Sequence, residues 1–229
     1  MMRSMDQVQV TVRQFGLERQ PVVVIDHFSG MTSDLHKAAL SADFSPAGAC
    51  YPGFRAPMVP SYLDRRRDLM FAVFRDVFGF TQGVRLESAA YSLVTLTPEQ
   101  LNAGQRKPHY DDASGNVIAI MHYLLGPESG GTAFYRHNRT GFEAITATRR
   151  AAFEASTKQD DKEFGKPPPE YCYGDDERYT LIGEIDARPD RLIAYRGSVL
   201  HSGIIPDPRI LSEDPAKGRL TINMFIEGR

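Results

Sequence analysis

The feature that most constrains the fold is a series of short apolar runs that begins at residue 84. These runs are rich in β-branched and aromatic residues, and Gly, Pro, Asn and Asp separate them. Many short strands divided by turn residues are typical of a β-sandwich or a β-barrel. The sequence therefore predicts a mainly β core over residues 84–229. The predicted strands are VRLESAAYSLVTL, NVIAIMHYLL, GGTAFYR, YTLIGEI, RLIAYRG and RLTINMFIE.

The first eighty residues have a mixed pattern that predicts one strand and at least two helices. QPVVVIDHFSG is typical of a short buried strand that ends in a turn. MTSDLHKAALSA predicts a helix, which Thr32, Ser33 or Asp34 can cap. We expect residues 1–80 to form a largely helical support for the β core.

The second predicted helix is amphipathic and covers SYLDRRRDLMFAVFRDVFG, which Gly79 can end. The Pro- and Gly-rich stretch before it, ACYPGFRAPMVP, predicts a loop. Three consecutive arginines, residues 65–67, are expected on the solvated face of this helix. The residues expected on its apolar face are Leu63, Met70, Phe71, Phe74 and Phe78.

One segment, residues 142–178, interrupts the series of strands. It begins with FEAITATRRAAFEAST, which predicts a helix, and continues with the polar, proline-rich stretch KQDDKEFGKPPPEYCYGDDER. We interpret it as an insertion between two strands. A chain of 229 residues fits one large β-rich domain, so residues 1–229 are expected to form a single domain.

Composition excludes several classes of protein. With 41% hydrophobic and 24% charged residues, the chain has the composition of a globular protein that buries a core. A net charge of −2 argues against bulk electrostatic binding of nucleic acid. Cys50 and Cys172 form no CxxC pair, which excludes a zinc ribbon and fits a reducing compartment. The N-terminus has no apolar leader, and no apolar run approaches the ~18 residues of a membrane span, which predicts a cytoplasmic protein.

The stretch KPHYDDASG places His109 two residues before Asp111. On a strand, residues i and i+2 project from the same face, so these two side chains would lie side by side. Two histidines and one carboxylate on one face are the ligand set of non-haem iron oxygenases. The pair therefore predicts two of three metal ligands, although a solvated loop fits the same spacing.

Among the remaining histidines, one is better placed than the others to be the third ligand. His201 follows an apolar strand and a Gly-Ser turn in RLIAYRGSVLHSG. His122 lies within an apolar strand, where a core histidine with satisfied hydrogen bonds is an equally good interpretation. The weaker candidates, in helical or loop segments, are His27, His36 and His137.

The last predicted strand, RLTINMFIE, has two faces of different character. The polar face carries Arg219, Thr221, Asn223 and Phe225. Inside a barrel, Arg219 would offer a planar fork for a carboxylate, and Thr221 or Asn223 could add a hydrogen bond. On the outside of the protein, the same face would simply be solvated. The other face is apolar, needs a core or a helical layer to cover it, and consists of Leu220, Ile222, Met224 and Ile226.

Taken together, these elements resemble the Fe(II)- and 2-oxoglutarate-dependent dioxygenases, especially the prolyl-hydroxylase-like branch and a bacterial subfamily within it. The resemblance covers residues 20–229, with the insertion unmatched. It implies a double-stranded β-helix, the jelly-roll or cupin-like fold. The matching stretches, in chain order, are PVVVIDHFSG, PHYDD, IMHYLL with SGGTAFY, DRLIAYRGSVLHSG and GRLTINMFI.

The resemblance implies a role for each matching residue. His109, Asp111 and His201 would be the ligands of Fe(II), and hence the catalytic residues. Arg219 would bind the distal carboxylate of 2-oxoglutarate. Further polar contacts with this co-substrate would come from Tyr123, Thr221 and Asn223.

The implied activity is that of a hydroxylase that uses Fe(II), 2-oxoglutarate and O2. Halogenating members of the superfamily lack the carboxylate at the position of Asp111, so its presence favours hydroxylation over chlorination. One departure is the gap of 18 residues between His201 and Arg219, which exceeds what is usual in the branch. The intervening loop is therefore expected to bulge out.

The expected substrate is a small molecule, an amino acid or a peptide. Arg136, His137 and Arg139 follow the GGTAFY strand and are expected at the mouth of a pocket, with Tyr51 and Arg55 as further candidates. Two alternatives stay open. One is a cupin-type metal-binding protein without 2-oxoglutarate chemistry, and the other is a non-catalytic ligand-binding module on the same fold.

Overall fold

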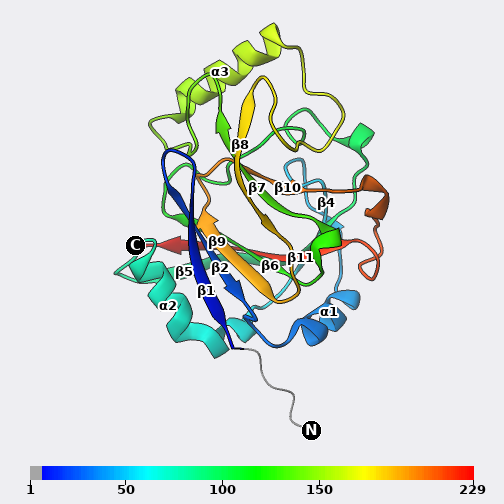
Figure 1. Ribbon diagram of the computed structural model, residues 1–229. Coiled ribbons are helices and arrows are strands. Elements are labelled where there is room, and N and C mark those ends of the chain that lie inside the picture. Colours follow the sequence, from blue (N-terminus) through cyan, green and yellow to red (C-terminus); the bar gives the residue numbers. More distant parts are fainter. Residues whose placement is uncertain (1–6) are drawn as a thin grey trace.

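Two antiparallel β-sheets face each other in the computed structural model, which describes residues 7–229 (Figure 1). Residues 1–6, part of the segment predicted to lack a leader, lie outside the described residues. The predicted mainly β fold with flanking helices is confirmed. The strands are β1 (Gln9–Phe15), β2 (Gln20–Asp26), β3 (Ser45–Pro46), β4 (Gly53–Pro57), β5 (Val84–Val94), β6 (Val117–Tyr123), β7 (Gly131–His137), β8 (Tyr179–Asp186), β9 (Arg191–Arg196), β10 (His201–Ile204) and β11 (Arg219–Gly228).

The larger sheet has eight strands in the order β1-β2-β9-β6-β11-β5-β4-β3, and the smaller sheet has three in the order β10-β7-β8. All the predicted strands are present, but the patterns gave no sign of β1, β3, β4 and β10. β1 is an edge strand with both faces exposed, so burial imposes no apolar alternation on it. β4 lies within the Pro- and Gly-rich stretch that predicted a loop, and it pairs with β5. The first eighty residues therefore supply strands as well as helices, and describing them as a helical support is incomplete.

Two helices, α1 (Thr32–Leu40) and α2 (Arg67–Asp76), cover the outer face of the larger sheet (Figure 1). A 3-10 helix, Ser61–Arg66, precedes α2. No helix in the described part of the chain combines the length and apolar character needed to cross a membrane. As expected, the apolar face of β11 is buried beneath this helical layer. The shared core includes Leu35, Ala39, Met70, Val73 and Phe74 of the helices and Leu220, Ile222, Met224 and Ile226 of β11.

Two details of the helices differ from expectation. α1 begins at Thr32, and no side chain caps its first turn, so the predicted cap is wrong. Phe71 is 46% exposed rather than part of the apolar face, because the buried stripe of α2 runs through Met70, Val73 and Phe74. Gly79 does end this segment, with φ of +78°.

The inner faces of the two sheets pack against each other and form a second core. Tyr195 of β9 and Phe134 of β7 meet edge to face, with ring centroids 5.1 Å apart. Such edge contacts are a favoured arrangement of aromatic rings. The buried residues of this inner core are Val22, Val24, Ala119, Tyr123, Phe134, Ala144, Ile185, Ala187, Ile193, Tyr195 and Val199.

The insertion lies between β7 and β8, as predicted. Its helix, α3 (Arg150–Glu163), sits at the opposite end of the molecule from α1 and α2 (Figure 1). The Glu143 carboxylate accepts hydrogen bonds from the backbone N–H groups of Leu17 and Glu18, both at 2.8 Å, and so ties the start of the insertion to the β1–β2 hairpin. The loop after α3 returns to the β core, where the Tyr171 hydroxyl donates to the Leu96 carbonyl at 2.6 Å.

A buried carboxylate, Asp190, holds the turn after β2 against the β8–β9 connection. It accepts hydrogen bonds from the backbone N–H groups of Ser29 (2.9 Å) and Gly30 (2.8 Å), and it lies 3.0 Å from His122 Nε2. Burial raises the pKa of Asp190, but the hydrogen bonds from His122, Ser29 and Gly30 together lower it below its usual value. The charged form is therefore the one that the fold requires.

We expect Asp190→Ala to lower the free energy of unfolding by about 3–5 kcal/mol, because buried donors lose their acceptor. The folded pKa lies below the unfolded value of about 4, so this contribution is complete above that pH and is lost as the pH falls through the folded pKa. Urea unfolding at several pH values measures both effects. An unchanged midpoint at pH 7 would contradict the assignment.

Candidate metal centre

His109, Asp111 and His201 come together at the wall of a cavity between the two sheets. Their ligand atoms all lie within 4.8 Å of one another. Asp111 Oδ1 is 3.8 Å from His109 Nε2, and Asp111 Oδ2 is 3.5 Å from His201 Nε2. Within residues 7–229, this is the only group of three or more His, Cys, Asp or Glu side chains with a spacing suited to a metal ion.

Main-chain hydrogen bonds set the positions of the three side chains. His109 and His201 exchange N–H···O=C bonds of 2.9 and 2.8 Å, so the segment at His109 continues the smaller sheet beyond β10. Opposed residues of an antiparallel pair share a face, and the two imidazole rings accordingly lie 4.4 Å apart. The Asp111 N–H donates to the Gly197 carbonyl at 2.7 Å, which keeps this segment extended. The i, i+2 spacing of the HxD motif therefore works as on a strand, although the segment forms only an isolated bridge.

His201 is held in one tautomer. Its Nδ1 lies 2.8 Å from the Val199 carbonyl. A carbonyl only accepts, so Nδ1 carries the proton and Nε2 keeps a lone pair for a metal ion. Burial lowers the pKa of His201 to about 4. The His109 side chain is 55% exposed to the cavity, and the surrounding cavity wall, with a smaller contribution from His201, lowers its pKa to about 4. Both rings are thus neutral near pH 7, the state in which imidazole binds metals.

Asp111 completes the cluster, and a nearby cation would stabilise the ionised form of its carboxylate. Burial raises its pKa, and interactions with His109 and with the Arg55 guanidinium partly oppose this effect. A metal ion at the same place would favour the ionised form strongly.

The low pKa values of the two histidines predict how pH acts on metal binding. We expect the Kd for Ni(II) to change little between pH 8 and about pH 6, because neither ring needs to lose a proton. Metal-free protein should lose stability as the pH falls from about 6.5 towards about 4, because only the unfolded chain protonates its histidines there. Calorimetric titrations at several pH values measure the Kd. A tenfold loss of affinity by pH 6 would show that the histidines titrate normally.

The cavity beside the cluster has a volume of about 800 Å³, within the range of small-molecule sites. Both sheets line it, and so does the insertion through Tyr171 and Cys172. Tyr171 and Cys172 are site residues that the sequence did not reveal, because their proline-rich segment has no periodic pattern.

Arg219 lies buried at the start of β11 and lines the cavity. Its Nε donates to the Ser129 carbonyl and its Nη2 to the Gly131 carbonyl, both at 2.9 Å. These bonds fix the plane of the guanidinium and leave Nη1 free of either carbonyl. The face of β11 that carries Arg219 is therefore the inner one, as the barrel interpretation predicted.

The three further polar residues predicted to contact 2-oxoglutarate occupy different positions. Asn223 lines the cavity. The Thr221 hydroxyl is buried and donates to Asn223 Oδ1 at 2.8 Å, so it positions the amide. The buried Tyr123 hydroxyl lies 2.7 Å from Thr132 Oγ1, and Thr132 is the member of that pair that lines the cavity.

His122 is a core residue. Its side chain is fully buried, with Nδ1 3.1 Å from the Tyr62 hydroxyl and Nε2 3.0 Å from Asp190 Oδ1. Both ring nitrogens are thus satisfied by protein groups, as one of the two interpretations of this residue expected.

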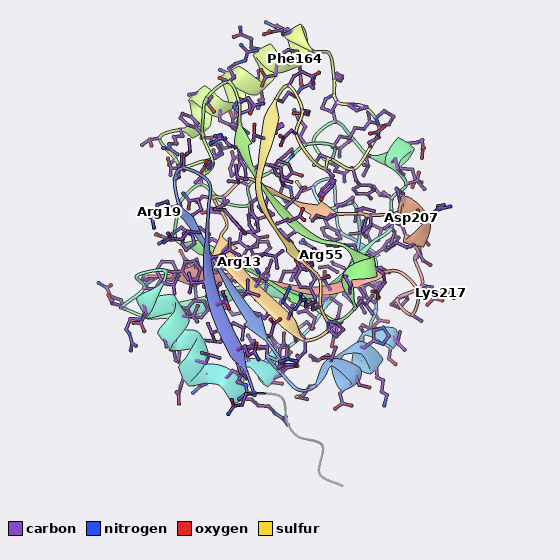
Figure 2. The ribbon with its side chains drawn as sticks, viewed as in Figure 1. Arg13, Arg19, Arg55, Phe164, Asp207 and Lys217 are labelled. Atoms are coloured by element: carbon purple, nitrogen blue, oxygen red, sulfur yellow. The ribbon has the colours of Figure 1, made fainter. Side chains whose placement is uncertain are left out.

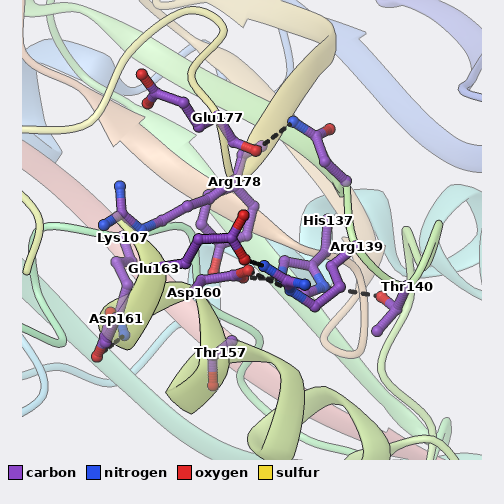
Figure 3. A network of polar contacts seen from close by, with 12 residues as sticks. Lys107, His137, Arg139, Thr140, Thr157, Asp160, Asp161, Glu163, Glu177 and Arg178 are labelled. Atoms are coloured by element: carbon purple, nitrogen blue, oxygen red, sulfur yellow. Dashed lines mark hydrogen bonds and ion pairs between the residues drawn. The ribbon is translucent and has the colours of Figure 1, made fainter. Parts of the chain in front are cut away.

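The expectation that Arg136, His137 and Arg139 lie at the mouth of the pocket is wrong. His137 is fully buried, with Nε2 2.7 Å from Asp160 Oδ2, and Arg139 Nε lies 2.5 Å from Asp160 Oδ1 (Figure 3). Arg136 pairs with Glu143 at 3.4 Å. The end of β7 turns towards α3, so these residues join the insertion to the β core instead of facing the cavity.

Arg55 and Tyr51, the weaker substrate candidates, do line the cavity. The Arg55 guanidinium stacks on the Tyr51 ring, with Cζ 4.4 Å from the ring centroid. Burial raises the pKa of Tyr51, and the charges of Arg219 and Arg55 both oppose this, which places the phenol near two guanidinium groups.

Comparison with solved structures shows which fold this is. One similar structure is the crystal structure of HygX from Streptomyces hygroscopicus with nickel and 2-oxoglutarate bound, which shares 18% sequence identity with this chain. The TM-score is 0.51, and the match covers 92% of this chain and 84% of that chain. The iron-bound structure of HygX is 17% identical, with a TM-score of 0.50, over 92% and 83%. At this identity the likeness shows a shared fold. It confirms the predicted jelly roll and, at the level of fold, the resemblance seen in the sequence.

A comparison of the sequence with curated proteins finds no match. The model of one family, described as "Family of unknown function (DUF6445)", matches residues 6–226.

Proposed function

The chain belongs to the family of unknown function DUF6445, and we propose that it is an Fe(II)- and 2-oxoglutarate-dependent oxygenase. Its reaction would be the hydroxylation of a C–H bond in a small-molecule, amino-acid or peptide substrate. The observation that carries the proposal is the cluster of His109, Asp111 and His201 on the wall of a cavity that also contains the buried Arg219.

The donor set fits iron(II). Two neutral imidazoles and one carboxylate on one face leave further coordination positions open, as in non-haem iron oxygenases. The fixed tautomer of His201 presents Nε2 to the cluster. No thiol belongs to the cluster, so the donors are those of iron oxygenases rather than those of a structural zinc site.

The co-substrate fits the other side of the cavity. 2-Oxoglutarate has a keto acid for the metal and a second carboxylate at the far end of a short chain. Arg219 suits that second carboxylate, because its plane is fixed by the Ser129 and Gly131 carbonyls and a guanidinium makes charge-assisted bonds to carboxylates. Asn223, held by Thr221, adds an amide on the same strand.

Each part of the chain then has a defined task. Iron(II) with bound 2-oxoglutarate supplies the oxidising chemistry, in which O2 converts the co-substrate to succinate and carbon dioxide. His109, Asp111 and His201 would hold the metal, and Arg219 would orient the co-substrate. The apolar wall, which includes Val117, would limit water around the reacting centre.

Formation of succinate tests the proposal. Purified protein is incubated in air with 2-oxoglutarate, with and without Fe(II), and succinate is quantified. We expect slow formation that requires both iron and folded protein, even before a substrate is known. A folded protein that binds iron but forms no succinate above the iron-free control would exclude this function and favour a cupin-type metal-binding protein.

A further inference from the structure

Arg55 is a second guanidinium in the same cavity, on β4. In Figure 2 it lies at the centre of the view, whereas Asp207 and Lys217 lie at the rim. Its Nε is buried and has no hydrogen-bond partner among residues 7–229. Buried polar groups in native proteins nearly always have a hydrogen-bond partner. The unpaired Nε of Arg55 therefore indicates that a ligand supplies the missing acceptor.

The sheet holds Arg55 on the face that carries Arg219. Arg55 pairs in register with Ser92, and Ser92 pairs with Thr221, so these three side chains share the inner face with Arg219. Stacking on the Tyr51 ring fixes the orientation of the guanidinium plane and leaves the N–H groups at its edge available to a ligand. The Tyr51 hydroxyl and the Ser92 hydroxyl are buried on the same wall and interact with each other. Within residues 7–229, the Arg55 Nε is therefore the unpaired group of this polar wall.

The other charged groups of the cavity wall have partners of their own. Lys107 lies 3.7 Å from Asp161, and Glu87 lies 2.6 Å from Arg85. Asp112 accepts a hydrogen bond from the Ser114 N–H at 2.7 Å. The charges of iron(II), Asp111, Arg219 and a 2-oxoglutarate dianion would cancel. Among the described residues, Arg55 is then the arginine or lysine of the cavity wall that has neither a hydrogen bond nor an ion pair of its own, and a partly buried charge without a direct partner is costly.

The wall next to the metal ligands is apolar. Val117 lies beside Asp111, since a side chain added at Gly197 would touch both. Ala119 and Phe225 pair in register across β6 and β11, and both line the cavity. The part of a substrate nearest to the metal would therefore rest on hydrocarbon and not on polar groups.

We propose that the substrate is a small molecule with a carboxylate, which binds Arg55, and an apolar body, which lies along Val117, Ala119 and Phe225. The inference rests on the proposed function, because the charge balance includes the metal and 2-oxoglutarate. Arg55 acts here as a specificity-determining residue: it binds the substrate and leaves the co-substrate to Arg219.

Fluorine NMR with 4-fluorophenylacetate and its neutral amide, 4-fluorophenylacetamide, tests this. The protein is loaded with Zn(II) and 2-oxoglutarate, so that the metal site and Arg219 are occupied and no turnover occurs. We expect the acid to bind roughly 10- to 100-fold more tightly than the amide, the range expected for hydrogen bonds to a charged group. Arg55→Met should remove this preference without changing the Kd of the amide, and Arg55→Lys should keep part of it. Arg209→Met, at an exposed arginine, is the matched control.

Two results would overturn the proposal. One is equal binding of the acid and the amide by wild-type protein. The other is a preference for the acid that survives in Arg55→Met and disappears in Arg219→Met, which would place the carboxylate at the co-substrate position. Two further titrations distinguish a failure of the substrate-site proposal from a failure of the proposed function. They are a calorimetric titration with 2-oxoglutarate and a parallel NMR titration of metal-free protein. A protein that binds the acid through Arg55 but does not bind 2-oxoglutarate would retain the anion site and refute the proposed function.

Discussion

Replacement of Asp111 by alanine is expected to abolish iron-dependent succinate formation and to weaken metal binding by more than about 100-fold, since even changes to groups that merely support a ligand cost 10- to 100-fold. Asp111 is the only anionic member of the cluster. Without it, two neutral imidazoles would have to hold a divalent cation in a cavity that also contains the positive Arg55 and Arg219. Calorimetric titration with Ni(II) measures the affinity, and the succinate assay measures the turnover.

The metal-free Asp111→Ala protein is expected to be at least as stable as the wild type. Burial raises the pKa of Asp111, so the carboxylate is held at some cost to the fold, as is common for functional groups. Asp112→Ala is the matched control, because Asp112 bonds to Ser114 in the adjacent loop and should leave metal binding intact. Metal affinity that falls in Asp112→Ala but not in Asp111→Ala would refute the assignment of the ligands.

Replacement of Arg219 by methionine is expected to raise the Kd for 2-oxoglutarate by about 30-fold or more, because loss of one partner of a buried charge pair typically costs at least about 2 kcal/mol. Metal binding should be unchanged, since Arg219 is not a member of the metal cluster. The variant also leaves the Ser129 and Gly131 carbonyls without a donor. We therefore expect the free energy of unfolding to fall by about 1–3 kcal/mol for each unpaired carbonyl. Titration of the metal-loaded protein with 2-oxoglutarate measures the first effect.

A second arginine separates the loss of the co-substrate from the loss of stability. Arg196 also donates to two carbonyls, those of Gly115 and Phe78, both at 2.7 Å, but it belongs to the wall near α2 and not to the residues that line the cavity. Arg196→Met should destabilise the protein to a similar degree and leave 2-oxoglutarate binding intact. Equal loss of 2-oxoglutarate binding in both variants would show that Arg219 acts through the fold alone.

The residues brought together at the candidate metal centre could be predicted because each carries a local signal. The spacing of His109 and Asp111 works on any extended segment, and the apolar strand before His201 marks a strand end. The alternation of β11 likewise separated a core face from a face with Arg219, and the structure buries the first under α1 and α2.

The remaining wall of the cavity depends on contacts that no local pattern reports. Arg55 lies on a strand within a stretch rich in proline and glycine, where pairing with β5 and β3 makes the backbone extended. Tyr171 enters the site because its hydroxyl reaches the distant Leu96 carbonyl. The wrong placement of His137 has the same origin, since its partner Asp160 belongs to the insertion.

The measurement that tests the proposed site most directly is an anaerobic titration of metal-free protein with Fe(II) and then 2-oxoglutarate, followed by visible absorption. We predict a weak charge-transfer band that appears only when both are present, that is absent in Asp111→Ala, and that needs a higher concentration of 2-oxoglutarate in Arg219→Met. A folded wild-type protein that gives no band would contradict the proposal and would reduce the cluster of His109, Asp111 and His201 to a site for some other metal or to a polar patch in the cavity wall.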